Sequence, residues 1–278
     1  MPDFENILFR VDGPVAAVTL NRPKRMNALT DDLLTELHVA LKLADEDDSV
    51  RVVVLTGSGG NFSAGFDLRG GTEYSKVDQP LQHYLWMIRS MRTNYQAIWN
   101  NRKPIVAKIR GKCIAGGCYL QMLCDIAVAA EDSILGHPAV ATGGVTGMPM
   151  WNWSLGTRKA KELLFTGKLI DGVEAERIGL VSMTAPDDEL DAFVDDVVAQ
   201  ILTVPHDSVT LTKEALNTAA DVMGLGTTWR TQGHMSALAR YSAALDLDID
   251  GLLERNRRKV EAIAARHRNG SAVGDRQV

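Results

Sequence analysis

Hydrophobic and polar positions alternate along the N-terminal part of the chain in a way that predicts a strand, a helix and a second strand. Pro14 to Leu20 and Arg51 to Thr56 are short, β-branched and bounded by turn-forming residues, which is typical of buried strands. Between them, Thr30 is a candidate helix N-cap. An apolar stripe with helical spacing follows it, formed by Leu33, Leu37, Ala40, Leu41 and Ala44.

The same alternation continues further along the chain. Pro104 to Ile109 and Cys124 to Ala130 again have the pattern of buried strands, with a short helix expected over Gly117 to Leu123 and another over Arg158 to Phe165. Alternating strands and helices indicate an α/β fold with parallel or mixed sheets.

Near Val204 the pattern changes from alternation to consecutive helices. Three amphipathic helices are expected, over Asp207 to Ala220, Gly226 to Leu245 and Ile249 to Ala265. We therefore divide the chain into an α/β core, residues 1–203, and a C-terminal helical region, residues 204–278.

Composition narrows the possible classes of protein. With 278 residues, 45% of them hydrophobic, the chain can bury a large core, and a net charge of −5 disfavours a nucleic-acid partner. The sequence contains neither a leader-like start nor a run of apolar residues long enough for a membrane span, so we expect a cytoplasmic protein without a membrane partner. Its three cysteines lack zinc-site spacing, which favours free thiols and no metal.

A basic stretch near the C-terminus is interpreted as a solvated helix face or as a contact for nucleotide phosphates. It comprises Arg255, Arg257, Arg258, Lys259, Arg266 and Arg268.

Two glycine-containing segments point to the chemistry. Phe62 to Leu68 and, about fifty residues later, Ala115 to Cys118 could each offer a backbone N–H group to one carbonyl oxygen. Small residues allow a ligand to approach the main chain closely, and the Gly116-Gly117 pair opens an apolar helix whose positive end favours negative charge. This pattern indicates stabilisation of an enolate or a tetrahedral intermediate.

Together with Asn21 to Leu29, these segments make the chain resemble the crotonase family, also called the enoyl-CoA hydratase/isomerase superfamily, over roughly residues 5 to 265. The resemblance implies a spiral of strand-strand-helix units, C-terminal helices that build a trimer or a dimer of trimers, and an acyl-CoA thioester as substrate. Coenzyme A would be part of that substrate, with no prosthetic group.

The resemblance also assigns roles to residues. It implies that the N–H groups of Phe66 and Gly116 form the oxyanion hole. The residues implied to bind coenzyme A, with Asp67 also ordering its loop, are Lys24, Arg25, Met26, Ala28, Ala64, Gly65, Asp67 and Leu68.

At the two positions where the family's hydratases carry catalytic glutamates, this chain has Tyr119 and Ala139, and no Asp or Glu occurs between Ser133 and Trp151. Tyr119 could donate a proton or orient water, and His137, beside the second position, is the conventional acid/base candidate there. Each could instead be structural. A predicted loop and helix over the acyl pocket adds further candidates, namely Glu73, Tyr74, Asp78 and His83.

Two interpretations of the function follow. The first is an enoyl-CoA hydratase-like enzyme with an atypical acid/base set, or a thioester hydrolase or isomerase that uses the same oxyanion hole. The second is a non-catalytic acyl-CoA or lipid-binding protein that has kept the pocket and lost the proton-transfer groups. An unrelated α/β scaffold, without affinity for coenzyme A, is the third possibility.

Overall fold

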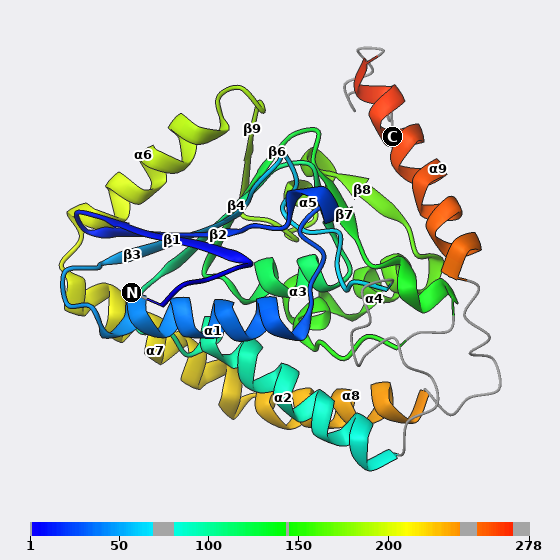
Figure 1. Cartoon of the computed structure of the whole chain (residues 1–278), viewed down its shortest axis with the longest axis horizontal. Helices are drawn as coiled ribbons and strands as arrows, with labels where there is room; N and C mark the ends of the chain where they lie inside the picture. The colour runs from blue at the N-terminus through cyan, green and yellow to red at the C-terminus, as the bar shows by residue number, and fades with distance from the viewer. Residues whose placement is uncertain (1, 69–80, 143–144, 240–248, 269–278) are drawn as a thin grey trace.

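A computed structural model describes residues 2–68, 81–142, 145–239 and 249–268 (Figure 1). Its main sheet has six strands in the order β1-β2-β3-β4-β6-β9, all parallel to their neighbours except β1, which pairs with β2 antiparallel. The strands are β1 (Ile7–Asp12), β2 (Val15–Leu20), β3 (Val52–Gly57), β4 (Ile105–Ile109), β6 (Ile126–Ala130) and β9 (Met183–Ala185). A second sheet has three, in the order β5 (Lys112–Ile114), β7 (Ile134–Gly136) and β8 (Leu169–Asp171).

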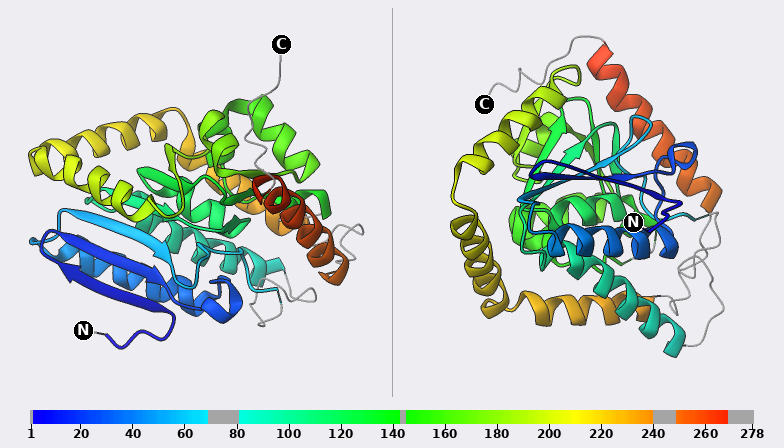
Figure 2. Two further views of the ribbon diagram at one scale, coloured as in Figure 1. Left: turned by 90° about the horizontal axis from the view of Figure 1, so that it is seen from above. Right: turned by 60° about the vertical axis from the view of Figure 1, so that its left-hand side comes forward.

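Helices cover both faces of the main sheet, which explains why its central strands are largely apolar, whereas β1 at the edge alternates buried and more exposed residues. The helices α1 (Asp31–Glu46), α2 (Leu81–Trp99) and α3 (Gly116–Leu123) lie on one face, and α6 (Leu190–Thr203) lies on the other (Figures 1 and 2). Under α6, Leu190 and Val194 pack on Val52, Val106 and Val128 in a cluster separate from the main core. The site described below is built on the α3 side.

The predicted α/β alternation is confirmed, with small shifts at the ends of elements. The Thr30 hydroxyl accepts a hydrogen bond from the Leu33 N–H at 3.2 Å and caps α1, whose predicted apolar stripe is fully buried. The helix predicted over Arg158 to Phe165 belongs to a longer one, α4 (Met150–Thr166). Gly156 interrupts it with φ 69°, and this break hid its first turns from the sequence pattern.

The C-terminal helices are α7 (His206–Val222), α8 (Leu225–Ala239) and α9 (Ile249–Arg268). The end of the second predicted helix, residues 240–245, lies outside the described residues. α5 (Gly172–Arg177), β9 and the strands of the second sheet were not predicted, because they are too short to show a period. α6 and β1 were not predicted either, although α6 buries Leu190, Val194 and Val197 at helical spacing and β1 alternates. Lys213 of α7 holds that helix to the core by an ion pair with Asp125 at 2.8 Å. The division at residue 204 stays a prediction.

On α9, the basic stretch has acidic partners of its own. Arg257 and Arg258 both pair with Glu254 at 3.0 Å and are largely exposed. This arrangement agrees with a solvated helix face. No helix among the described residues has the length and apolar character that crossing a membrane requires.

Candidate functional site

The Asn21 to Leu29 motif and the Phe62 to Leu68 motif pair through their backbones. The Leu29 N–H donates to the Gly65 carbonyl at 2.8 Å, and the Asp67 N–H donates back to the Leu29 carbonyl at 2.9 Å. The Ala64 N–H donates to the Met26 carbonyl at 2.9 Å. The segment 62–68 is therefore fixed on one side by the segment that the resemblance assigns to coenzyme A.

On its other side, the 62–68 segment pairs with the chain leading into α3. The Ser63 N–H donates to the Lys112 carbonyl at 2.8 Å, and the Ile114 N–H donates to the Ser63 carbonyl at 2.9 Å. A β-carbon added to Gly65 would lie 3.2 Å from the Gly116 nitrogen, and one added to Gly116 would lie 3.1 Å from the Phe66 ring. The structure thus brings the two predicted donor residues, Phe66 and Gly116, together.

Asn27, which sequence reasoning did not single out, joins these segments from inside. Its side chain is fully buried, and its amide accepts from the Arg22 N–H at 2.9 Å while donating to the carbonyls of Ser58 and Asn61 at 2.8 and 2.7 Å. The Ser63 hydroxyl donates to the Asn27 carbonyl at 2.8 Å. Asn27 has a φ of 52°, in the left-handed region that asparagine tolerates better than most residues.

Arg22, also missed, holds the end of the same segment. Its guanidinium donates to the Asp67 carboxylate at 3.0 Å and to the Ala28 carbonyl at 2.5 Å. Asp67 is 5% exposed and Arg22 20%, so this is a largely desolvated ion pair. The contact fits the loop-ordering role expected of Asp67.

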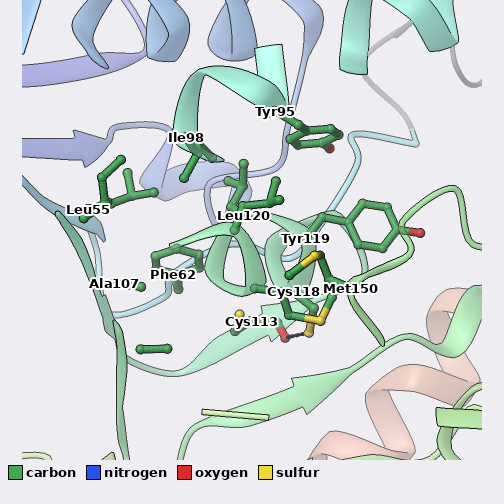
Figure 3. Packing of buried hydrophobic residues seen from close by; sticks show 14 of the residues in the cluster. Leu55, Phe62, Tyr95, Ile98, Ala107, Cys113, Cys118, Tyr119, Leu120 and Met150 are labelled. Atoms are coloured by element: carbon green, nitrogen blue, oxygen red, sulfur yellow. Dashed lines mark hydrogen bonds between the residues drawn. The ribbon is translucent and has the colours of Figure 1, made fainter. Parts of the chain in front are cut away.

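α3 carries Tyr119 into the site. The helix begins at Gly116, after Ala115 with φ 52°, and all its residues are buried. The Tyr119 hydroxyl lies 2.7 Å from Nε2 of His137 and 2.8 Å from the Thr146 hydroxyl. In Figure 3 this hydroxyl points away from the apolar cluster that packs around α3. Thr146 was not predicted, because a threonine without an ionisable group carries no acid/base signal in the sequence.

Burial sets the protonation state of His137. Loss of hydration lowers its pKa from 6.5 to about 4, so the imidazole is neutral at physiological pH. Its Nδ1 has no hydrogen-bond partner among the described residues. The neutral ring can therefore share a hydrogen bond with the Tyr119 hydroxyl.

A cavity of about 250 Å³ opens beside Tyr119. Phe66 and Tyr119 line it together with residues of α2, α8 and the segment before α4: Leu85, Ile88, Arg89, Met91, Arg92, Tyr95, Gly147, Met148, Trp229, Arg230, Gly233, His234 and Ser236. None of these described lining residues is Asp or Glu. Glu73, Tyr74 and Asp78, together with the His83 side chain, lie outside the described residues.

The predicted coenzyme A contacts fall into two groups. Lys24 and Arg25 are exposed on a single helical turn, η1 (Pro23–Arg25), and Met26 follows it, also exposed. The other members, Ala28, Ala64, Gly65, Asp67 and Leu68, lie in or against the 62–68 segment. Figures 1 and 2 show η1, in dark blue, on the side of the molecule away from α2 and α8.

The cysteines are free thiols. Cys118 donates to the Cys113 carbonyl at 2.8 Å inside the core (Figure 3), and burial raises the pKa of the Cys113 thiol well above its usual value. This position suits packing rather than nucleophilic chemistry. Within the described ranges, His, Cys, Asp and Glu side chains do not gather in threes as metal ligands would.

Comparison with known proteins identifies relatives over most of the chain. The sequence model of the family described as enoyl-CoA hydratase/isomerase matches residues 10–243. A probable mitochondrial enoyl-CoA hydratase of Dictyostelium discoideum is 36% identical over 76% of this chain and 74% of its own, and a putative enoyl-CoA hydratase of Mycobacterium tuberculosis is 35% identical over 80% and 76%. The crystal structure of an enoyl-CoA hydratase from Mycobacterium smegmatis superposes with a TM-score of 0.83 at 30% identity, covering 93% and 92% of the two chains.

Proposed function

Because the chain belongs to the enoyl-CoA hydratase/isomerase family, we propose that it is an acyl-CoA-processing enzyme that stabilises a thioester enolate or oxyanion with the N–H groups of Phe66 and Gly116. The observation that carries the proposal is the side-by-side placement of the 62–68 segment and the first residue of α3. The relatives named enoyl-CoA hydratase support an acyl-CoA thioester as substrate.

The placement of Gly116 favours anion stabilisation for two reasons. The first N–H groups of a helix have no acceptor within that helix, and the helix dipole makes this end positive. Gly116 is the first residue of α3. A thioester oxygen held here would accept hydrogen bonds that strengthen as it becomes an enolate oxygen, and this difference lowers the barrier.

The hydroxyl of Tyr119 is the proposed proton donor. In hydration, the oxygen of a water molecule bonds to Cβ of the enoyl group, the double-bond electrons move onto the thioester oxygen, and Cα then takes a proton. Tyr119 would give that proton and regain one released by the water through its partners His137 and Thr146, so that no net charge is left behind. Burial disfavours a positive charge on His137, so the imidazole would be a hydrogen-bonded intermediate in that return and not a lasting proton acceptor.

Coenzyme A would lie along η1 and the 62–68 segment. Lys24 and Arg25 are exposed cations suited to phosphate groups, and Met26 and Ala28 would flank the pantetheine. The backbone of Ala64 and Gly65 would face the adenine. Arg22 donates to Ala28 and to Asp67, and it would therefore act as a positioning residue for both the segment after η1 and the 62–68 segment.

Mass spectrometry in deuterated water tests this proposal. Butyryl-CoA, crotonyl-CoA and cinnamoyl-CoA are incubated with the protein, and hydration, deuterium uptake at Cα and thioester loss are scored together. We expect hydration or deuterium uptake that falls by about 10²-fold or more in Tyr119→Phe. Tyr95→Phe, which removes another hydroxyl from the same cavity, should cost much less.

The alternative outcomes separate the remaining interpretations. Thioester loss without hydration would identify a hydrolase. Binding of all three thioesters with no mass change would contradict the catalytic proposal and favour a non-catalytic acyl-CoA binder. No affinity for any thioester or for free coenzyme A would refute both.

The C-terminal helices are the proposed assembly surface, for a trimer or a dimer of trimers in the cytoplasm. Large apolar side chains are exposed on and after α7 and on α8, namely Leu211, Leu216, Val222, Met223 and Leu238. Such exposure is unusual for a surface that stays in water. Light scattering should give a trimeric or hexameric mass that Leu216→Glu reduces and Leu8→Glu, on exposed β1, does not. A monomeric wild-type protein would contradict the assembly.

A further inference from the structure

The cavity carries a feature that the proposed chemistry does not use. α2 and α8 touch where Gly233 lies against Ile88, so closely that a β-carbon on Gly233 would be 2.6 Å from Cγ2 of Ile88. Only a glycine permits this approach. Around this crossing, α2 and α8, which are far apart in the sequence, together form part of the cavity wall.

Basic side chains line the cavity from both helices at this crossing. Arg89 and Arg92 come from one face of α2, and Arg230 and His234 from one face of α8, in each case spaced so that they are neighbours on the helix surface. The described lining residues include no carboxylate to balance them. Three guanidinium groups, which stay charged at any physiological pH, therefore line one cavity.

One of these arginines has an unsatisfied donor within the described part of the chain. Nε of Arg92 is buried and has no hydrogen-bond partner there. Arg89 and Arg230 are exposed, and the Arg230 guanidinium donates to the Thr227 hydroxyl at 3.3 Å. A buried donor of a charged group is costly without an acceptor. Since Arg92 lines the cavity, an anion bound there would supply that acceptor.

The position of the cavity decides which part of the ligand this anion belongs to. The phosphates of coenzyme A are expected at η1, on the other side of the 62–68 segment (Figures 1 and 2). Phe66 lies between η1 and the cavity. It lines the cavity, and its N–H is assigned to the thioester oxygen. A group in contact with Arg92 is therefore on the acyl side of the thioester.

We infer that the acyl group carries a carboxylate at its far end, so that the ligand is a coenzyme A monothioester of a dicarboxylic acid, held by Arg92 with Arg89 and Arg230. A carboxylate suits the planar fork of guanidinium donors better than a hydroxyl or an alkyl end does. This inference rests on the proposed function, because it takes the cavity to be the acyl site.

Calorimetric titration with glutaryl-CoA and pentanoyl-CoA tests it, because these thioesters have acyl chains of equal length and differ in the terminal carboxylate. We expect wild-type protein to bind glutaryl-CoA about tenfold more tightly or better. Arg92→Met should abolish that preference by weakening glutaryl-CoA binding about tenfold more than pentanoyl-CoA binding. Arg158→Met, on an exposed part of α4, should keep the preference.

Other results would overturn the inference. Equal affinity of the wild-type protein for the two thioesters would refute the carboxylate site and leave the acyl-CoA proposal intact. Equal weakening of glutaryl-CoA, pentanoyl-CoA and free coenzyme A by Arg92→Met, with an unchanged unfolding temperature, would assign the arginine to phosphate binding instead. If neither thioester nor free coenzyme A bound the wild-type protein, the proposed function would fail together with the inference.

Discussion

The two walls of the site are held in place by different interactions. The loop wall, residues 22–29, 62–68 and 112–117, is a set of backbone hydrogen bonds reinforced by Asn27 and by the Arg22–Asp67 ion pair. The helix wall, formed by α2, α3, α8 and residues 137–142 and 145–148, presents side chains instead, with Tyr119 in contact with both His137 and Thr146. Backbone donors do not depend on the identity of the side chains around them, whereas the contacts of the helix wall do.

This difference bears on the proposed acid/base set. An oxyanion hole made of N–H groups needs only the right backbone path, so the side chains around it can change without loss of the anion site. Proton transfer depends on the side chains placed opposite, and the proposal assigns it to Tyr119 with its partners His137 and Thr146. The loop wall would therefore fix the class of intermediate, and the helix wall the reaction and the acyl group.

Breaking the ion pair of the loop wall should have the largest effect. Asp67→Ala leaves the Arg22 guanidinium largely buried without its carboxylate, and we expect a loss of about 4 kcal/mol in the free energy of unfolding, measured with urea. Asp12→Ala is the matched control, because the Arg10–Asp12 pair at 3.4 Å is well exposed and should contribute little. Similar losses in both variants would mean that burial of the pair is not what matters.

Lowering the pH should reduce the stability of the folded protein through His137 in the helix wall. Its pKa is about 4 in the folded protein and 6.5 ordinarily, so between these values the unfolded chain binds a proton that the folded one does not. Stability from this residue is complete above pH 6.5 and falls as the pH drops towards 4, by about 3 kcal/mol.

His137→Gln gives the comparison for this pH dependence. Urea unfolding from pH 7 to pH 4 should show a shallower loss of stability in the variant, because glutamine does not titrate. Identical slopes for wild type and His137→Gln would contradict a neutral, buried imidazole.

A methyl group added to the loop wall should lower the free energy of unfolding by somewhat less than the protonation of His137 does. In Gly117→Ala the new β-carbon would lie 2.6 Å from the Ser63 carbonyl oxygen, a backbone atom that cannot rotate away, and we expect about 2 kcal/mol of destabilisation in urea. In Gly116→Ala the nearest atom, at 2.8 Å, is the end of the Leu29 side chain, which can move. A larger loss of stability in Gly116→Ala than in Gly117→Ala would contradict the view that the Ser63 carbonyl is the more rigid neighbour.

The smallest effect is expected from the second partner of Tyr119. Thr146→Val keeps the shape of the side chain and removes the hydroxyl that lies 2.8 Å from the Tyr119 oxygen, at a cost of about 1 kcal/mol in unfolding free energy. If the hydroxyl also takes part in proton return, turnover should fall by more than stability does. Unchanged turnover in Thr146→Val would restrict the relay to His137.

Sequence patterns predicted the loop wall better than the helix wall. The buried strands, α1 and the glycine segments depend on local features such as apolar runs, a capping threonine and small residues, and these are visible in the sequence. The roles of Asn27 and Arg22 depend on carbonyls and a carboxylate from other segments. The placement of Arg92 and Arg230 in the lining of one cavity depends on the crossing of α2 and α8, which no local pattern encodes.

The central claim is that a backbone donor at Gly116 stabilises the intermediate, and a pair of variants tests it most directly. Gly116→Pro and Gly116→Ala both add a β-carbon, but only proline removes the N–H. Rates would be measured on the thioester that the wild-type protein converts fastest, with binding and folding checked by calorimetry and circular dichroism. We predict that Gly116→Ala keeps most of the activity and that Gly116→Pro, still folded and still binding, loses about 10²- to 10³-fold. Undiminished turnover in Gly116→Pro would contradict the account.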